Sequence, residues 1–344
     1  MSVERGSIWY AAQTSASPLD RRAFLVSAGV LAVASATPSW ARGPATYPPP
    51  DRELMAPVPG GRVYVRVNGR VDGPRLPVVM IHGGPGGNHA AFLTALALAS
   101  ERAVILYDQL DSGLSERPND RRNWTVDRFT DEVEAVRSAL GVPRWHVLGA
   151  SWGGTIALEY GARRPAALAG LVLASPLVST RSWLADAAAL RKQLPPDVQA
   201  TLRQCDPPAS ITPACEKATD AFYANFNRRE PRSDGYEAYV AAHPALRSHT
   251  KLYETMWGSS EFVSTGTLKN YDGERLLTKL YGAHTLFIDG QYDEARPSTI
   301  GNFAERVRGA EFAVIPGAGH GFLSDRPEEA LGILRPWLER QDCA

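Results

Sequence analysis

The feature that most constrains this chain is an alternation of short apolar runs with helix-like segments. Most of the runs are continuously apolar, as expected for strands that are covered on both faces. They cover residues 62–67, 76–81, 103–107, 145–148, 171–174, 284–288 and 311–315. Helical patterns lie between or after them, at residues 125–140, 152–162 and 328–340. Strands that alternate with helices predict an α/β fold with a mostly parallel sheet flanked by helices.

The alternation stops after Pro176 and resumes at His284. In between, the sequence favours helices joined by proline-rich segments, and no run there matches the predicted strands in strength. A parallel-sheet domain with a helical insertion explains this pattern. We therefore predict a helical cap over residues 178–279 and a core formed by residues 42–177 and 280–344.

Residues 1–41 resemble an export signal. Arg21 and Arg22 precede an apolar stretch of about 14 residues, which is shorter than the roughly 20 residues of a membrane-spanning helix. Small residues follow as candidate cleavage positions. The pattern predicts a twin-arginine-type signal peptide and a periplasmic or secreted mature chain, with no stable membrane insertion after signal removal.

Export permits disulfide bonds. Cys205 and Cys215 are close in sequence and form a candidate bridge, with two free thiols as the alternative, and Cys343 has no evident partner. The charge balance bears on partners: 37 Lys and Arg face 37 Asp and Glu, a formal net charge of +0. This balance argues against a nucleic-acid partner bound by neutralising phosphates.

The strongest local signal is Gly149-Ala150-Ser151-Trp152-Gly153, a G-x-S-x-G segment between an apolar run and a helical pattern. That setting is typical of a nucleophile elbow, in which the serine occupies a sharp strand-to-helix turn. The flanking glycines remove side chains that would clash across the turn. Ser151 is therefore the predicted nucleophile, with a purely structural turn as the alternative.

The glycine-rich segment His82-Gly83-Gly84-Pro85-Gly86-Gly87 follows the run at 76–81. Such a turn leaves backbone amides free to bind the oxyanion of an acyl-transfer intermediate. We expect the amides of Trp152 and Gly84 to be the donors, with Gly83 as the alternative. A phosphate loop is excluded because no Gly-Lys-Ser/Thr ending follows. We expect His82 to fix the turn.

A serine nucleophile needs a base and a carboxylate that orients the base. Of the seven histidines, His320 is the best candidate, since it lies in a glycine-rich loop after the last predicted strand. Asp293 follows the run at 284–288, and Asp289 at the end of that run is the alternative acid. The order Ser, Asp, His is that of the α/β-hydrolase fold. No metal-ligand spacing such as H-E-x-x-H is present, so we expect neither a metal nor a cofactor.

Taken together, these segments resemble the proline iminopeptidase family of α/β-hydrolases, which also includes L-amino acid amidases. The resemblance extends over about residues 50–340 and is carried by five segments. They are His82-Gly83-Gly84-Pro85-Gly86, Tyr107-Asp108-Gln109-Leu110-Asp111-Ser112-Gly113-Leu114-Ser115, Gly149-Ala150-Ser151-Trp152-Gly153-Gly154, Met256-Trp257-Gly258-Ser259-Ser260-Glu261-Phe262 and Gly290-Gln291-Tyr292-Asp293-Glu294-Ala295-Arg296-Pro297. It implies a serine hydrolase that releases N-terminal amino acids of the proline type from small peptides, or hydrolyses amino acid amides, through an acyl-enzyme.

The resemblance also implies a site for the substrate's free α-amino group. Family members hold this group with carboxylates, and Glu261 in the cap and Glu294 beside the predicted acid match them. A desolvated ammonium requires such paired negative charge and hydrogen bonds. The alternative is that both glutamates are surface or ion-pair residues.

Two positions depart from the family pattern. Leu110-Asp111 stands where a glycine-containing pair is common, and Ser259 stands where proline is common. Because the cap sets the acyl pocket, the preferred acyl residue stays open. A carboxylesterase or lactonase on the same fold is the alternative function, and a non-catalytic binding protein is a minor one. An epoxide hydrolase or dehalogenase would have an aspartate at position 151.

Overall fold

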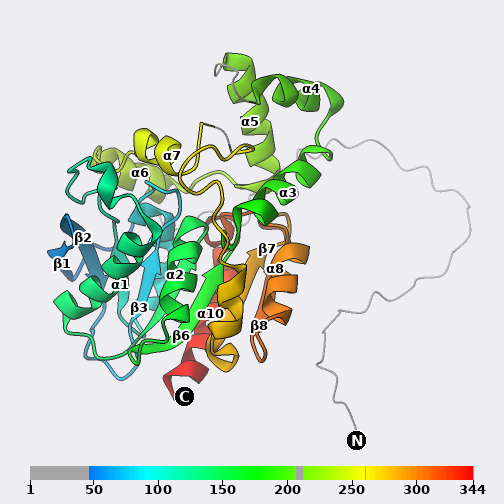
Figure 1. Cartoon of the computed structure of the whole chain (residues 1–344). Helices are drawn as coiled ribbons and strands as arrows, with labels where there is room; N and C mark the ends of the chain where they lie inside the picture. The colour runs from blue at the N-terminus through cyan, green and yellow to red at the C-terminus, as the bar shows by residue number, and fades with distance from the viewer. Residues whose placement is uncertain (1–45, 207–211, 260, 344) are drawn as a thin grey trace, which may run out of the picture. The chain divides into compact units, whose positions relative to one another are not determined.

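The computed structural model describes residues 46–206, 212–259 and 261–343, so the predicted export signal lies outside the described residues. Within the described residues, eight strands form one sheet in the order β1-β2-β4-β3-β5-β6-β7-β8 (Figure 1). They are β1 (Arg52–Val58), β2 (Gly61–Asn68), β3 (Val78–Ile81), β4 (Val104–Tyr107), β5 (Trp145–Ala150), β6 (Leu168–Ala174), β7 (Thr285–Gly290) and β8 (Glu311–Ile315). β1–β2 and β2–β4 pair antiparallel, and the other pairs are parallel. The predicted mostly parallel sheet is confirmed.

Strand β1 is the element of the sheet that the apolar pattern did not predict. It lies at the edge of the sheet, pairs only with β2, and keeps several side chains exposed. Its apolar run, Leu54 to Ala56, is short and lies between charged residues and Pro57, so its sequence signal is weak.

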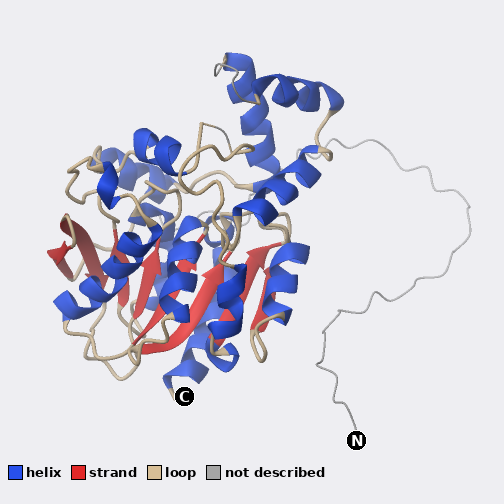
Figure 2. Cartoon of the chain, viewed as in Figure 1, coloured by secondary structure: helices blue, strands red, loops and turns tan. Residues whose placement is uncertain are grey.

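The apolar side chains of the central strands pack into two hydrophobic cores, one on each face of the sheet. In β3, Val79 and Ile81 belong to one core, whereas Val78 and Met80 belong to the other. Helices α1 (Val126–Leu140), α2 (Trp152–Ala162) and α8 (Pro297–Glu305) cover the first face, and η2 (His89–Leu98) and α10 (Pro327–Asp342) cover the second (Figure 2). Burial on both faces explains why these strands do not alternate apolar and polar residues.

Between β6 and β7 the chain is built from helices, and we call residues 178–279 the cap region. The helices are α3 (Thr180–Arg191), α4 (Pro196–Cys205), α5 (Pro213–Phe226), α6 (Asp234–Ala242), α7 (Thr250–Met256) and η4 (Glu274–Lys279). Short helices η3 (Arg121–Asn123), η5 (Gly282–His284) and α9 (Phe322–Asp325) complete the chain. In Figure 1, α3, α5 and α7 lie beyond the arrowheads of the parallel strands. The cap region therefore faces the edge of the sheet at which the strands end.

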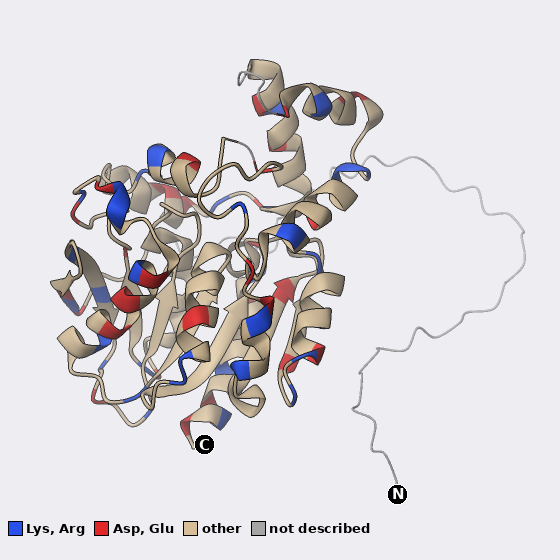
Figure 3. Cartoon of the chain, in the orientation of Figure 1, with Lys and Arg blue, Asp and Glu red and all other residues tan. Residues whose placement is uncertain are grey.

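Charged residues are interspersed over the core helices and the cap region, with Lys and Arg beside Asp and Glu (Figure 3). Several form exposed ion pairs, such as Arg62 with Glu116 and Arg340 with Glu311. Among the described residues, no helix is long and apolar enough to cross a membrane.

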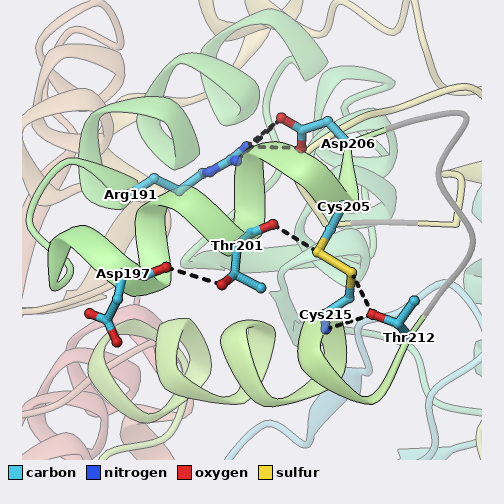
Figure 4. Close-up of a disulfide and its surroundings, with 7 residues drawn as sticks. All are labelled: Arg191, Asp197, Thr201, Cys205, Asp206, Thr212 and Cys215. Atoms are coloured by element: carbon cyan, nitrogen blue, oxygen red, sulfur yellow. Dashed lines mark hydrogen bonds and ion pairs between the residues drawn. A yellow bond between two sulfur atoms is a disulfide. The ribbon is translucent and has the colours of Figure 1, made fainter.

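A disulfide joins two neighbouring helices of the cap region (Figure 4). Cys205 is the last residue of α4, and Cys215 lies in the first turn of α5. Arg191 of α3 forms an ion pair with Asp206, directly after the first cysteine. Together these contacts tie α3, α4 and α5 to one another.

Candidate active site

All the candidate catalytic residues follow the carboxyl ends of parallel strands. Gly83 and Gly84 follow β3, Ser151 follows β5, Asp293 follows β7 and His320 follows β8. In open α/β sheets this edge is where ligands bind, because loops from several parallel strands meet there. The topology thus brings together residues that are far apart in sequence.

Ser151 occupies a sharp turn between β5 and α2, with φ 58° and ψ −122°. A non-glycine residue with positive φ is strained and persists only where its surroundings enforce it. The flanking glycines are required sterically: a Cβ at Gly149 would lie 2.1 Å from the Gly153 carbonyl oxygen, and a Cβ at Gly153 would lie 2.0 Å from that of Ile81. This packing therefore requires glycine at positions 149 and 153, on either side of Ser151.

His320 and Asp293 form a buried hydrogen-bonded pair, with His320 Nδ1 2.7 Å from Asp293 Oδ1. The carboxylate also accepts hydrogen bonds from Ser175 Oγ at 2.5 Å and from the backbone N–H of Ala295 at 2.8 Å. Burial alone raises the pKa of Asp293, but His320 and these hydrogen bonds hold that pKa below its usual range. The carboxylate is thus ionised and fixed toward the imidazole.

Asp289, the alternative acid, lies within β7 and is completely buried. Burial and the nearby charge of Asp293 raise the pKa of Asp289 well above its usual range. Of the two aspartates, Asp293 is the one that contacts His320. Burial and this neighbouring charge favour the neutral form of Asp289.

The predicted oxyanion loop lies against the serine. A Cβ added at Gly83 would be 2.9 Å from Ser151 Cβ, so the backbone of this loop approaches Ser151 as only glycine permits. Trp152 is the first residue of α2, and the N–H groups of a first helical turn have no partner inside the helix. Gly83, Gly84 and Ser151 line one pocket, and Gly153 in the first turn of α2 packs against the Ile81 and His82 carbonyls at the start of the loop.

A buried network supports this loop. His82 Nε2 accepts a hydrogen bond from the Gln109 N–H at 3.0 Å, and the Gln109 side chain donates to the His82 carbonyl at 2.7 Å. The same side chain accepts the indole N–H of Trp152 at 2.9 Å. His82 thus takes the turn-fixing place that its sequence position suggested. The contribution of Gln109 was not anticipated, although the residue lies in a segment that carries the family resemblance.

Glu261 enters the site from the cap region. Its carboxylate accepts hydrogen bonds from Trp183 Nε1 at 3.0 Å, Tyr253 Oη at 2.6 Å and Tyr223 Oη at 3.3 Å. Its three donors come from α3, α7 and α5, so three helices of the cap region hold one carboxylate. The arrangement is inconsistent with a freely solvated surface glutamate.

Glu294 lies next to Asp293 and is 4% exposed. Asn227 Nδ2 donates to its Oε1 at 2.6 Å, whereas Oε2 is buried and has no hydrogen-bond partner among the described residues. Burial and the neighbouring charge of Glu261 raise the pKa of Glu294 to about 8. This carboxyl group is an incomplete hydrogen-bonding site, since a buried acceptor normally has a donor.

The end of α5 holds the two catalytic loops together. The carbonyl of Phe226 accepts the N–H of Glu294 at 3.1 Å and that of His320 at 3.0 Å, and the carbonyl of Asn227 accepts the N–H of Gly321 at 2.7 Å. The sequence did not reveal this joint, because a backbone carbonyl leaves no residue-type signal. The Asn227 amide and the Ser175 hydroxyl were missed as well: Ser175 lies just beyond a predicted strand, Asn227 lies in a part of the cap region where no individual helix was predicted, and neither belongs to a motif.

One pocket unites these groups. It is lined by residues from both the core and the cap region, among them Gly84, Ser151, Tyr253, Glu261, Glu294 and His320. No Lys or Arg belongs to the described residues that line it. Two carboxyl groups therefore share a pocket that also holds His320 but, among its described lining residues, neither Lys nor Arg.

Comparison with known proteins agrees with this architecture. The family model for the α/β-hydrolase fold matches residues 77–327. A proline iminopeptidase of Heyndrickxia coagulans is 34% identical over 283 residues, covering 82% of this chain and 96% of the relative. Crystal structures of a Mycobacterium smegmatis proline iminopeptidase and of VinJ are each 32% identical, with TM-scores of 0.75 and 0.76. Both cover 85% of this chain, and the match spans 99% and 100% of them.

The chain is thus a member of the α/β-hydrolase fold family, and it is a hydrolytic enzyme. Within that family it belongs with the proline iminopeptidases, as the motifs in its sequence predicted.

Proposed function

We propose that the enzyme releases N-terminal amino acids of the proline type from small peptides, or hydrolyses the corresponding amides, through an acyl-enzyme. The observation that carries this proposal is the pair Glu261 and Glu294 beside Ser151. Glu294 has a buried oxygen without a donor, and no Lys or Arg lines the pocket around the pair in the described part of the chain. A substrate ammonium supplies a positive charge to the pair and a donor to that oxygen.

Proline fits this arrangement in a specific way. An N-terminal prolyl group carries two N–H donors on its secondary ammonium, one for each carboxylate. With the ammonium held there, only the first amide bond of a peptide reaches Ser151. The names of the relatives support this choice of acyl group.

In the proposed mechanism Ser151 attacks the carbonyl carbon while His320 Nε2 takes the serine proton. Asp293 orients the imidazole through Nδ1 and stabilises the imidazolium. The amides of Trp152 and Gly84, with Gly83 as the alternative, hold the oxyanion. His320 then protonates the leaving amine, and water hydrolyses the acyl-enzyme along the reverse proton path.

The test compares proline p-nitroanilide with its N-acetyl form. Acetylation removes the positive charge and leaves the scissile bond unchanged, so we expect cleavage of the free amine only. Equal cleavage of both substrates would assign the pocket to the alternative, a carboxylesterase or lactonase. Labelling of the protein by a fluorophosphonate, lost in Ser151→Ala, tests the nucleophile and separates an enzyme from a binding protein.

We also propose that the enzyme acts outside the cytoplasm, in the periplasm or after secretion. The support is the Arg21-Arg22 pair with its apolar stretch, together with the Cys205–Cys215 disulfide in the cap region. We expect cell fractionation to find the protein in the periplasm or medium. Replacing both arginines by lysine should retain it in the cytoplasm, and unchanged export of that variant would refute the twin-arginine route.

A further inference from the structure

The two nitrogens of His320 face different carboxylates. Nδ1 is hydrogen-bonded to Asp293, whereas Nε2 lies 3.7 Å from Glu294 Oε1. In the proposed mechanism Nε2 is the atom that must be free to take the serine proton. The carboxyl group assigned to the substrate's ammonium is therefore also a direct electrostatic neighbour of the catalytic base.

We propose that Glu294 makes the proton affinity of His320 depend on the substrate, so that His320 becomes a free base when an ammonium group occupies the Glu294 site. This inference rests on the proposed function and deepens it. Without a ligand, the negative surroundings stabilise an imidazolium. A bound ammonium places a positive charge at Glu294, cancels that stabilisation, and drives the proton of His320 into bulk water.

The other charged groups around His320 are fixed by partners of their own. Asp293 is held by Ser175 and backbone N–H groups, and Glu261 is held by cap-region donors. Trp183 of α3 packs edge-on against the imidazole, with ring centroids 5.5 Å apart. The carboxylate on that helix, Asp186, is bonded to Thr299 and to the backbone of Arg296. Of the carboxyl groups among the described residues that line the pocket, Glu294 is the one with an oxygen, Oε2, left for a ligand.

The protonation energetics agree with the geometry. Burial lowers the pKa of His320, but Asp293 and Glu294 outweigh burial and raise the pKa to about 9. At pH 7 such a group is neutral in roughly 1% of molecules. Glu294 and His320 titrate as a pair, and a cation beside them lowers the proton affinity of the pair whichever group holds the last proton. At about 4 Å in a partly buried site, one charge is enough to shift a pKa by about one unit or more.

The consequence is a second level of selectivity. A substrate without an ammonium meets an imidazolium, which cannot accept the serine proton. Such a substrate is rejected by the chemistry as well as by weak binding. Esters or amides of uncharged acids should therefore react mainly at alkaline pH.

The experiment compares pH profiles for two substrates of one enzyme. For p-nitrophenyl acetate, kcat/KM reports the base in the free enzyme, and kcat reports it in a complex without an ammonium. For proline p-nitroanilide, kcat reports the base with the ammonium in place. We expect the apparent pKa in the prolyl complex to be lower by about one unit or more than both ester values. Equal pKa values in the two complexes would overturn the proposal.

Glu294→Gln provides an independent readout. The amide oxygen still accepts the hydrogen bond from Asn227, but the negative charge is gone. The ester profile of this variant should move to lower pH by about one unit, because the imidazolium has lost one stabilising charge. Ester hydrolysis itself shows that the core is folded, and an unmoved profile would refute the role of Glu294.

These outcomes are distinct from failure of the proposed function. If no free-amine substrate is cleaved, the proposed function fails. If proline p-nitroanilide is cleaved while its complex shows the same pKa as the ester complex, only the coupling fails.

Discussion

Asp293 and Glu294 are neighbours in one loop, yet they occupy opposite kinds of site. Both oxygens of Asp293 have donors, whereas one oxygen of Glu294 has none among the residues that the structure describes. The pKa of Asp293 is held below its usual range, and that of Glu294 is raised to about 8. We call Asp293 the complete site, because the protein itself supplies donors to both of its oxygens. We call Glu294 the incomplete site, because its Oε2 is left for a donor from the substrate.

The contrast separates two tasks. A group that orients the catalytic base must have one fixed geometry, because a small displacement of the base is costly in rate. A group that binds a cation must keep an acceptor free for it. The protein satisfies Asp293 from the core and leaves Glu294 to be completed by a ligand, with Asn227 of the cap region as its single side-chain donor.

The largest effect is expected from a change at the complete site, Asp293. Asp293→Asn removes the charge and favours the wrong imidazole tautomer, so kcat should fall by about 10⁴-fold. Asp289→Asn is the matched control, since Asp289 is already neutral, and it should change kcat less than about threefold. Steady-state kinetics on proline p-nitroanilide would measure both. Similar losses in the two variants would show that the acid has been misassigned.

The next largest effect is expected at the two glutamates proposed to bind the ammonium. Glu261→Gln and Glu294→Gln should each lower kcat/KM for proline p-nitroanilide at pH 8 by about 10- to 100-fold, which corresponds to the loss of one charge-assisted contact to the ammonium. Hydrolysis of p-nitrophenyl acetate should persist in both variants. A parallel loss on the ester would mean that these residues support the fold or the base and do not recognise the amine.

A smaller effect is expected at the donor of Glu294. Asn227→Ala removes the hydrogen bond to Oε1 and leaves the backbone joint at the end of α5, so kcat/KM for the prolyl substrate should fall about tenfold. Asn225→Ala is the control: this exposed residue lies on the same helix, and its amide bonds to the Ala221 carbonyl. Asn225→Ala should be neutral, and equal effects of both changes would point to helix stability instead.

The complete site was predictable from the sequence, and the incomplete site only in part. The glycines beside Ser151 are required by a turn that leaves no room for a Cβ, and the loops of Asp293 and His320 follow predicted strands. Such constraints act over a few neighbouring residues, so they leave a local pattern. The order of the three residues along the chain then indicates which loops must meet.

The cap region leaves no comparable pattern. Glu261 and Glu294 were singled out by the family resemblance, but their partners come from three helices whose packing no local motif encodes. Trp183, Tyr223 and Tyr253 lie between 8 and 78 residues from Glu261 and meet only in the folded chain. Strand β1 was missed for a related reason: its pairing with β2 identifies it as a strand more clearly than its own residues do.

The smallest effect is expected from removing the disulfide, which tests whether it supports the Glu294 site. Cys215 lies in the first turn of α5, and the other end of that helix carries Phe226 and Asn227. The paired change Cys205→Ser and Cys215→Ser opens a loop with a sequence separation of 10, which should lower the stability of the cap region by about 2–3 kcal/mol. Thermal unfolding under oxidising and reducing conditions would measure this. The end of α5 bonds the backbone of both Glu294 and His320, but only Glu294 also receives the Asn227 side chain. The kcat/KM for the prolyl substrate should therefore fall by about two- to threefold, and ester hydrolysis should fall less. An equal decline for both substrates would show that α5 supports the catalytic pair as much as the amine site.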